Sequence, residues 1–160
     1  MNDIFLLKNN LDTKVLSFVL LTAVTGGIYP LMWLFLNQQK LTEAMKDNFV
    51  DSNYPLWIAA VTGLGWFLSD FSYEISDEDN ILDYIAALLS LASVVMYIVW
   101  GFKAKTALQA YTLKEYKFEL KMNIFYTILF NVYYIVYCIN SMESECKKHK
   151  IIFSQHQGNC

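Results

Sequence analysis

The sequence contains no arginine, and all twelve basic residues among its 160 are lysine. Recognition of nucleic acids and phosphate groups depends heavily on arginine, because its planar guanidinium binds phosphate oxygens in pairs. The absence of arginine therefore argues against a nucleic-acid partner. Charged residues make up only 17% of the chain, whereas a soluble domain carries about 25%. The chain has too few charges to cover an ordinary soluble surface.

Cysteine is also scarce. Three cysteines, Cys138, Cys146 and Cys160, lie close to one end of the chain. An odd number of clustered cysteines argues against a disulfide framework and favours thiols that face a reducing compartment.

Apolar residues, by contrast, are abundant at 56%, and aromatic residues make up 16%. This much apolar surface does not fit inside one small core, which indicates lipid as the solvent. Four apolar segments follow one another, at residues 15–37, 54–73, 82–102 and 122–141. Each is close to the ~20 residues that cross a ~30 Å hydrocarbon layer as a helix. We expect a single membrane domain over residues 1–142 and a polar cytoplasmic tail over residues 143–160.

The distribution of lysines along the chain indicates which segments cross the membrane. Four crossing segments would divide the lysines into five and seven, whereas proteins of the inner membrane concentrate lysine on the cytoplasmic side. If the first and fourth segments turn back, all twelve lysines lie on one side and the lysine-free acidic loop 70–83 lies on the other. If only one segment turns back, the division is 10:2 or 9:3. The favoured fold is an all-α integral membrane protein with two transmembrane helices flanked by two re-entrant helical hairpins; the alternative is four transmembrane helices. Both termini are then cytoplasmic and loop 70–83 is outside.

Local chemistry favours turns within the first and fourth segments. Two glycines and a proline interrupt the first segment at its middle, and Asn131, which tolerates a left-handed conformation, lies near the middle of the fourth. A hairpin tip in lipid needs protein partners for its backbone, so we expect both tips to contact the second and third segments. The candidate hairpin residues are Gly26, Gly27, Tyr29, Pro30, Trp33, Asn131, Tyr133 and Tyr137.

The second and third segments contain pairs of small residues four apart. These pairs are Ala59 with Gly63 and Ala86 with Ser90. Such spacing lets two membrane helices approach closely, although small pairs also occur by chance in apolar helices. We take these four residues as candidates for helix packing.

Two further helical elements are expected beside the membrane. The third segment continues as helix through residues 104–110, since nothing there stops it. Leu41, Ala44 and Met45 lie at helical spacing among charged residues, which predicts a short interfacial helix after the first segment.

The first and fourth segments also resemble each other. At a shift of 104 positions, residues 27–33 align with residues 131–137 as a turn residue, a β-branched residue, tyrosine, and later a second aromatic residue.

The sequence Thr25-Gly26-Gly27-Ile28-Tyr29, with Trp33 and Asn37 downstream, resembles the T-x-G-I-Y…W…N signature of domain-of-unknown-function family 4234. Its members are small prokaryotic multi-pass membrane proteins. The resemblance covers residues 15–46 well and residues 123–142 loosely, and it covers the middle only as hydropathy. Where the family more often has one bulky residue and one glycine, this chain has two glycines, and Pro30 occupies a variable position. The resemblance implies no activity, because the family has none assigned.

Residues that could carry chemistry are few. No titratable side chain other than tyrosine or cysteine lies in the charge-free parts of the four segments (15–37, 54–69, 84–102 and 122–141), which argues against ion-coupled transport. No acid–base pair indicates catalysis, so we expect no enzyme and no cofactor.

A tetrahedral zinc site would need the four ligands near the end of the chain: Cys146, His149, His156 and Cys160. Only six residues separate the two ligand pairs, against roughly twelve in zinc fingers, and a mobile lysine-rich tail is the preferred interpretation.

These observations favour a small non-enzymatic protein of the bacterial inner membrane. It is expected to act through helix packing with a membrane partner, as an accessory, regulatory or immunity-type subunit. The alternative is a homo-oligomer that shapes the bilayer, forms a pore or transports a solute. The expected partners are the lipid bilayer and either another membrane protein or a second copy of the chain.

Overall fold

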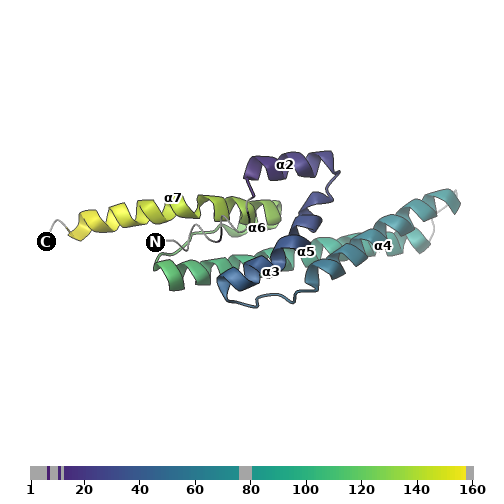
Figure 1. Ribbon diagram of the computed structural model, residues 1–160. Coiled ribbons are helices and arrows are strands. Elements are labelled where there is room, and N and C mark those ends of the chain that lie inside the picture. The colour runs from purple at the N-terminus through teal and green to yellow at the C-terminus, as the bar shows by residue number, and fades with distance from the viewer. Residues whose placement is uncertain (1–6, 8–10, 12, 76–80, 158–160) are drawn as a thin grey trace.

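The computed structural model describes Leu7, Leu11 and residues 13–75 and 81–157, and these residues form helices and turns without a strand (Figure 1). The all-α prediction is therefore confirmed. The helices are α2 (Val15–Val24), α3 (Tyr29–Met45), α4 (Tyr54–Ile75), α5 (Ile81–Tyr116), α6 (Ile124–Phe130) and α7 (Val132–Gln157).

The helices α4 and α5 form a long antiparallel pair (Figure 1). Two hydrogen bonds join them: the Thr62 hydroxyl lies 3.1 Å from Ser93 Oγ, and the Tyr54 hydroxyl donates to the carbonyl oxygen of Met96 at 3.0 Å. α5 continues past the apolar region, as the sequence predicts for residues 104–110, and ends at Tyr116. Because the helices extend to Ile75 and from Ile81, they include both ends of the predicted loop 70–83. The remainder of that loop, residues 76–80, lies outside the described residues.

The first apolar segment is divided by a turn between α2 and α3. Gly26 and Gly27 have φ angles of +60° and +92°, which glycine adopts without strain. The Thr25 hydroxyl donates to the carbonyl of Leu21 at 2.7 Å and accepts from the backbone N–H of Tyr29 at 3.0 Å, so it joins the end of α2 to the start of α3. Pro30 lies in the first turn of α3, where its missing N–H costs no helical hydrogen bond.

The fourth segment is divided at Asn131, between the seven-residue α6 and the start of α7. Asn131 has a φ angle of +42° and a ψ angle of −112°, a rare positive-φ conformation that lies outside the left-handed helical region predicted for it. Asn123 begins α6, and its Oδ1 accepts from the N–H of Phe125 at 2.8 Å. Neither α2 nor α6 is long enough to cross a ~30 Å layer by itself, because a helix rises ~1.5 Å per residue.

α3 is one continuous helix, which corrects the expectation of a separate interfacial helix at Leu41, Ala44 and Met45. Leu41 and Met45 are buried in the core. The helix continues because Gln38, in its middle, is buried and accepts a hydrogen bond from the indole N–H of Trp100 at 2.8 Å. Similarly, α7 continues from the membrane domain predicted over residues 1–142 into the predicted tail, and it ends at Gln157.

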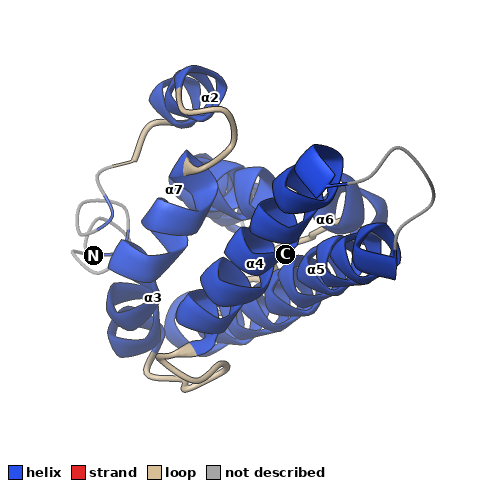
Figure 2. Cartoon of the chain, turned by 90° about the vertical axis from the view of Figure 1, so that its right-hand side faces the viewer, coloured by secondary structure: helices blue, strands red, loops and turns tan. Residues whose placement is uncertain are grey.

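Burial changes sharply along α5. Leu88, Leu91 and Val94 are 66%, 61% and 53% exposed, whereas Ala104 and Leu108 are 2% and 1% exposed. The well-packed core therefore surrounds the second half of α5, where α3 and α7 lie against it (Figure 2). Among the described residues, α5 is the one helix both long and apolar enough to cross a membrane, and only 22% of its apolar window is buried. A core helix of a soluble protein would be mostly buried, so this exposure supports association with a membrane.

Candidate functional site

Both turns line the same cavity. It has a volume of about 500 Å³ and lies between the α2–α3 turn, the α6–α7 turn and the middle of α4. Six of the predicted hairpin and packing residues come together around it: Gly27, Pro30, Ala59, Gly63, Asn131 and Tyr133. The other lining residues are Ile28, Leu31, Thr62, Trp66, Tyr97, Leu129, Phe130 and Val132. We call this cavity the inter-turn groove.

One phenylalanine holds the two turns together. Phe18 of α2 is fully buried, and its ring meets the rings of Tyr29, Trp33 and Tyr133 edge-on at centroid distances of 5.3, 5.6 and 5.1 Å. Tyr29 and Tyr133 align with each other at the shift of 104 positions, and in the structure both rings contact the ring of Phe18. The sequence offered no signal for Phe18, because a phenylalanine in an apolar helix is unremarkable. Tyr137, the last predicted hairpin residue, does not line the inter-turn groove and is 55% exposed.

The small residues of α4 divide into two sets. A Cβ added to Gly63 would meet nothing within 4 Å, and Ala59 lines the groove beside it. The contact with α5 is made instead by Gly65, where an added Cβ would lie 3.3 Å from Leu89 Cβ and 3.5 Å from Ser90 Oγ. The predicted packing role of Ser90 therefore has a partner that the sequence analysis did not identify. Gly63 thus faces open space within the described structure, Ala59 is half-buried at the groove wall, and Ala86 is buried.

A second glycine that the sequence analysis missed supports the α6–α7 turn. The Asn131 side chain lies against Gly101 of α5, so closely that a Cβ on Gly101 would be 2.7 Å from Asn131 Oδ1. This Oδ1 atom is buried and has no hydrogen-bond partner. No aspartate, glutamate, lysine or histidine lines the groove. The surface of the groove therefore suits an apolar ligand or side chain rather than acid–base chemistry.

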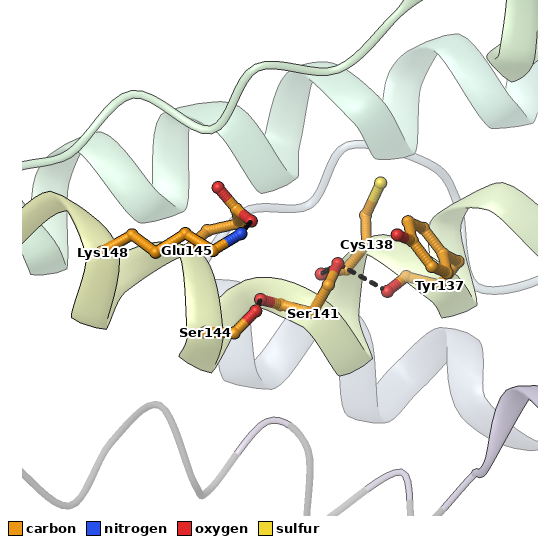
Figure 3. Close-up of polar contacts among 6 residues, drawn as sticks. All are labelled: Tyr137, Cys138, Ser141, Ser144, Glu145 and Lys148. Carbon is orange, nitrogen blue, oxygen red and sulfur yellow. Dashed lines mark hydrogen bonds and ion pairs between the residues drawn. The ribbon is translucent and has the colours of Figure 1, made fainter.

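A second group of polar residues lies along α7 (Figure 3). The Ser141 hydroxyl donates to the carbonyl of Tyr137 at 2.9 Å, and that of Ser144 donates to the carbonyl of Ser141 at 2.9 Å. Lys148 Nζ lies 2.7 Å from Glu145 Oε1, and this hydrogen bond raises the pKa of Lys148.

The candidate zinc ligands belong to this end of the chain. Cys146 is buried and His149 packs its ring against Phe118 at 6.0 Å. The side chain of His156, and Cys160 altogether, lie outside what the structure describes. α7 is one continuous helix as far as Gln157, and ten residues of helix separate Cys146 from His156 by about 15 Å along the axis. Zinc ligands bind at ~2 Å, so these two residues cannot hold one ion in this conformation.

Comparison with known proteins identifies one family. The model of a family described as "Domain of unknown function (DUF4234)" matches residues 13–110, more than half of the chain. The matched region includes the α2–α3 turn, α4 and most of α5. No curated protein and no solved structure matches the chain.

Proposed function

The chain belongs to the DUF4234 family, and on this premise we propose that it is a non-enzymatic, multi-pass protein of the bacterial inner membrane that binds a helix of another membrane protein. In this role it is an accessory, regulatory or immunity-type subunit. The single observation that carries the proposal is the inter-turn groove, which the chain builds around a small-residue face and leaves unfilled.

The proposed topology has two transmembrane helices and two re-entrant hairpins. α4 and the first part of α5 cross the bilayer, with both termini and all lysines in the cytoplasm and loop 70–83 outside. The exposed leucines and valines of α5 support this placement, as does the concentration of lysine on one side. The two turns meet α4 between Ala59 and Trp66, near its midpoint. Hairpins that enter from the cytoplasm and turn back half-way would meet α4 at this level.

The groove matches the requirements of a helix-docking site in a membrane. Helices associate in lipid mainly where small residues let their backbones approach. Ala59 and Gly63 provide such a face, and the open space beside Gly63 leaves room for a partner's side chains. Asn131 lines the groove at the α6–α7 turn, and its side chain is packed against Gly101 of α5, so the groove wall is held in place on that side. The lack of charged lining residues supports a binding role over catalysis.

Filling the groove tests this proposal. Gly63→Leu adds a side chain where the isolated chain has space, and it also removes a helical glycine, which favours the helix by up to ~1 kcal/mol. We expect the variant to fold at least as stably as the natural chain but to lose its partner on purification from the native host in mild detergent. Ala87→Leu, which creates the same side chain at an exposed position of α5, is the matched control and keeps the partner.

Native mass measurement of the purified complexes separates the outcomes. A stoichiometric foreign membrane protein that is present with the natural chain and with Ala87→Leu, but absent with Gly63→Leu, supports the proposal. A complex that contains only copies of this chain would contradict it and favour the homo-oligomer. A partner that survives Gly63→Leu would place the binding surface elsewhere.

A further inference from the structure

Two cavities outside the inter-turn groove meet at Tyr134 and Tyr137. The first is an apolar groove of about 560 Å³ between α2 and the α6–α7 unit, and the second is a polar cavity of about 380 Å³ between α7 and the segment 118–121. Both volumes are within the ~300–1,000 Å³ usual for ligand sites. The other residues of the apolar groove are Val15, Val19, Thr22, Ala23, Phe130 and Tyr133. The polar cavity includes Glu119, Lys121, Ser141, Glu145, Lys148 and His149.

The polarity of this combined site changes in one direction along α7. Its apolar end lies beside the α6–α7 turn, and its charged end lies about three to four helical turns beyond Tyr133, at Glu145 and Lys148 (Figure 3). Tyr134 and Tyr137, with nearly parallel rings at 6.4 Å, mark the change. Tyrosine favours the boundary between hydrocarbon and headgroups, because its ring is apolar and its hydroxyl polar. In the proposed topology, the same direction runs from the membrane interior to the cytoplasm.

The charged end of the combined site contains both positive and negative side chains. Lys148 and Glu145 form an ion pair, while Lys121 and Glu119 line the cavity without an ion pair to any described residue. A ligand with a single negative charge would meet two carboxylates as well as two ammonium groups. A headgroup with a phosphate and a primary ammonium would satisfy both unpaired residues, because Lys121 donates to the phosphate and Glu119 accepts from the ammonium.

We propose that this site binds one phospholipid of the cytoplasmic leaflet whose zwitterionic headgroup ends in a primary amine. The acyl chain occupies the apolar groove against Val19 and Ala23, and the headgroup lies between Lys121 and Glu119. This inference depends on the membrane placement in the proposed function, since the lipid must reach the site from the inner leaflet. It does not depend on the partner helix, because the inter-turn groove adjoins this site only at Phe130 and Tyr133 and shares none of its other lining residues.

The test uses the full chain in mild detergent, with lipids of identical acyl chains bearing ethanolamine, choline or glycerol headgroups, and native mass spectrometry of the bound lipid. We expect the ethanolamine lipid to be retained about tenfold more strongly than the choline lipid, because a quaternary ammonium cannot donate a hydrogen bond to Glu119. Glu119→Gln should remove most of this preference, and Lys121→Gln should weaken both lipids. Ala23→Phe should abolish retention by filling the groove. Lys103→Gln, an exposed charge change on α5, is the control and should change nothing.

Equal retention of all three lipids, or preference for the glycerol headgroup, would overturn the headgroup assignment. A preference unchanged by Ala23→Phe would overturn the site itself. Membrane fractionation separates these results from failure of the proposed topology: a chain that leaves the membrane fraction at high pH contradicts the topology, whereas a membrane-integrated chain without lipid preference contradicts only this inference.

Discussion

Replacing Gly101 by alanine places a methyl group where the Asn131 side chain already lies. The added Cβ would be 2.7 Å from Asn131 Oδ1 and 3.2 Å from Asn131 Cγ. To relieve this contact, the Asn131 side chain must leave its place against Gly101, or the α6–α7 turn or α5 must move. The turn has little freedom, because Asn131 already has a φ angle of +42°. We therefore predict that Gly101→Ala destabilises the fold.

The magnitude follows from two opposing effects. Alanine favours a helix over glycine by about 0.8–1.0 kcal/mol, whereas overpacking a filled position costs typically ~1–3 kcal/mol. Gly63→Ala isolates the first effect, because a Cβ there meets nothing within 4 Å. The two variants should therefore differ by about 1–3 kcal/mol in free energy of unfolding, with Gly101→Ala the less stable. At ~2–4 °C per kcal/mol for a chain of this size, the melting temperatures should separate by several degrees.

Thermal unfolding in mild detergent measures this difference, with tryptophan fluorescence as the signal because Trp100 is adjacent to Gly101. The double variant Gly101→Ala/Asn131→Gly removes the contact, keeps a residue that tolerates positive φ, and should restore the melting temperature. If Gly101→Ala melts at or above the temperature of Gly63→Ala, the close packing of the turn on α5 is wrong.

Two further predictions concern the core and the topology. Trp100→Phe removes the donor to Gln38 Oε1 and leaves the whole buried amide unpaired, since Gln38 Nε2 already lacks a partner; we expect a loss of about 1–3 kcal/mol, largely recovered in the double variant with Gln38→Leu, and an unchanged melting temperature would contradict this. In a cysteine-free background, Tyr73→Cys at the end of α4 should react with a membrane-impermeant thiol reagent on intact cells, and Ser144→Cys only after permeabilisation. Labelling of Ser144→Cys in intact cells would exclude a cytoplasmic α7.

Helix-breaking residues in the sequence made the two helix breaks predictable. The glycine pair with Pro30 marks the first turn by backbone chemistry alone, and Asn131 marks the second by its tolerance of positive φ. The seven residues that align at a shift of 104 positions are too short a match to predict that the two turns meet, although Tyr29 and Tyr133 do contact a common ring.

Features that depend on which distant side chain contacts a residue were not predictable from the sequence. Gly65 and Gly101 matter because Ser90 and Asn131 approach them, and no local pattern distinguishes them from Gly63, which faces open space. The continuity of α3 was missed for a similar reason. In the sequence, Gln38 follows the first apolar segment as a polar residue. In the structure, Trp100, sixty-two residues later, donates a hydrogen bond to its buried side chain.

The central claim is that the inter-turn groove holds a helix from another membrane protein. The most direct measurement places a photo-crosslinking amino acid at Gly63 in the native host, with the same amino acid at Leu91, an exposed position on α5, as the control. The account predicts a single foreign membrane protein crosslinked from position 63 and not from position 91, with the adduct lost when Ala59→Leu narrows the groove. Adducts that are the same from both positions, or that contain only a second copy of the chain, would contradict it.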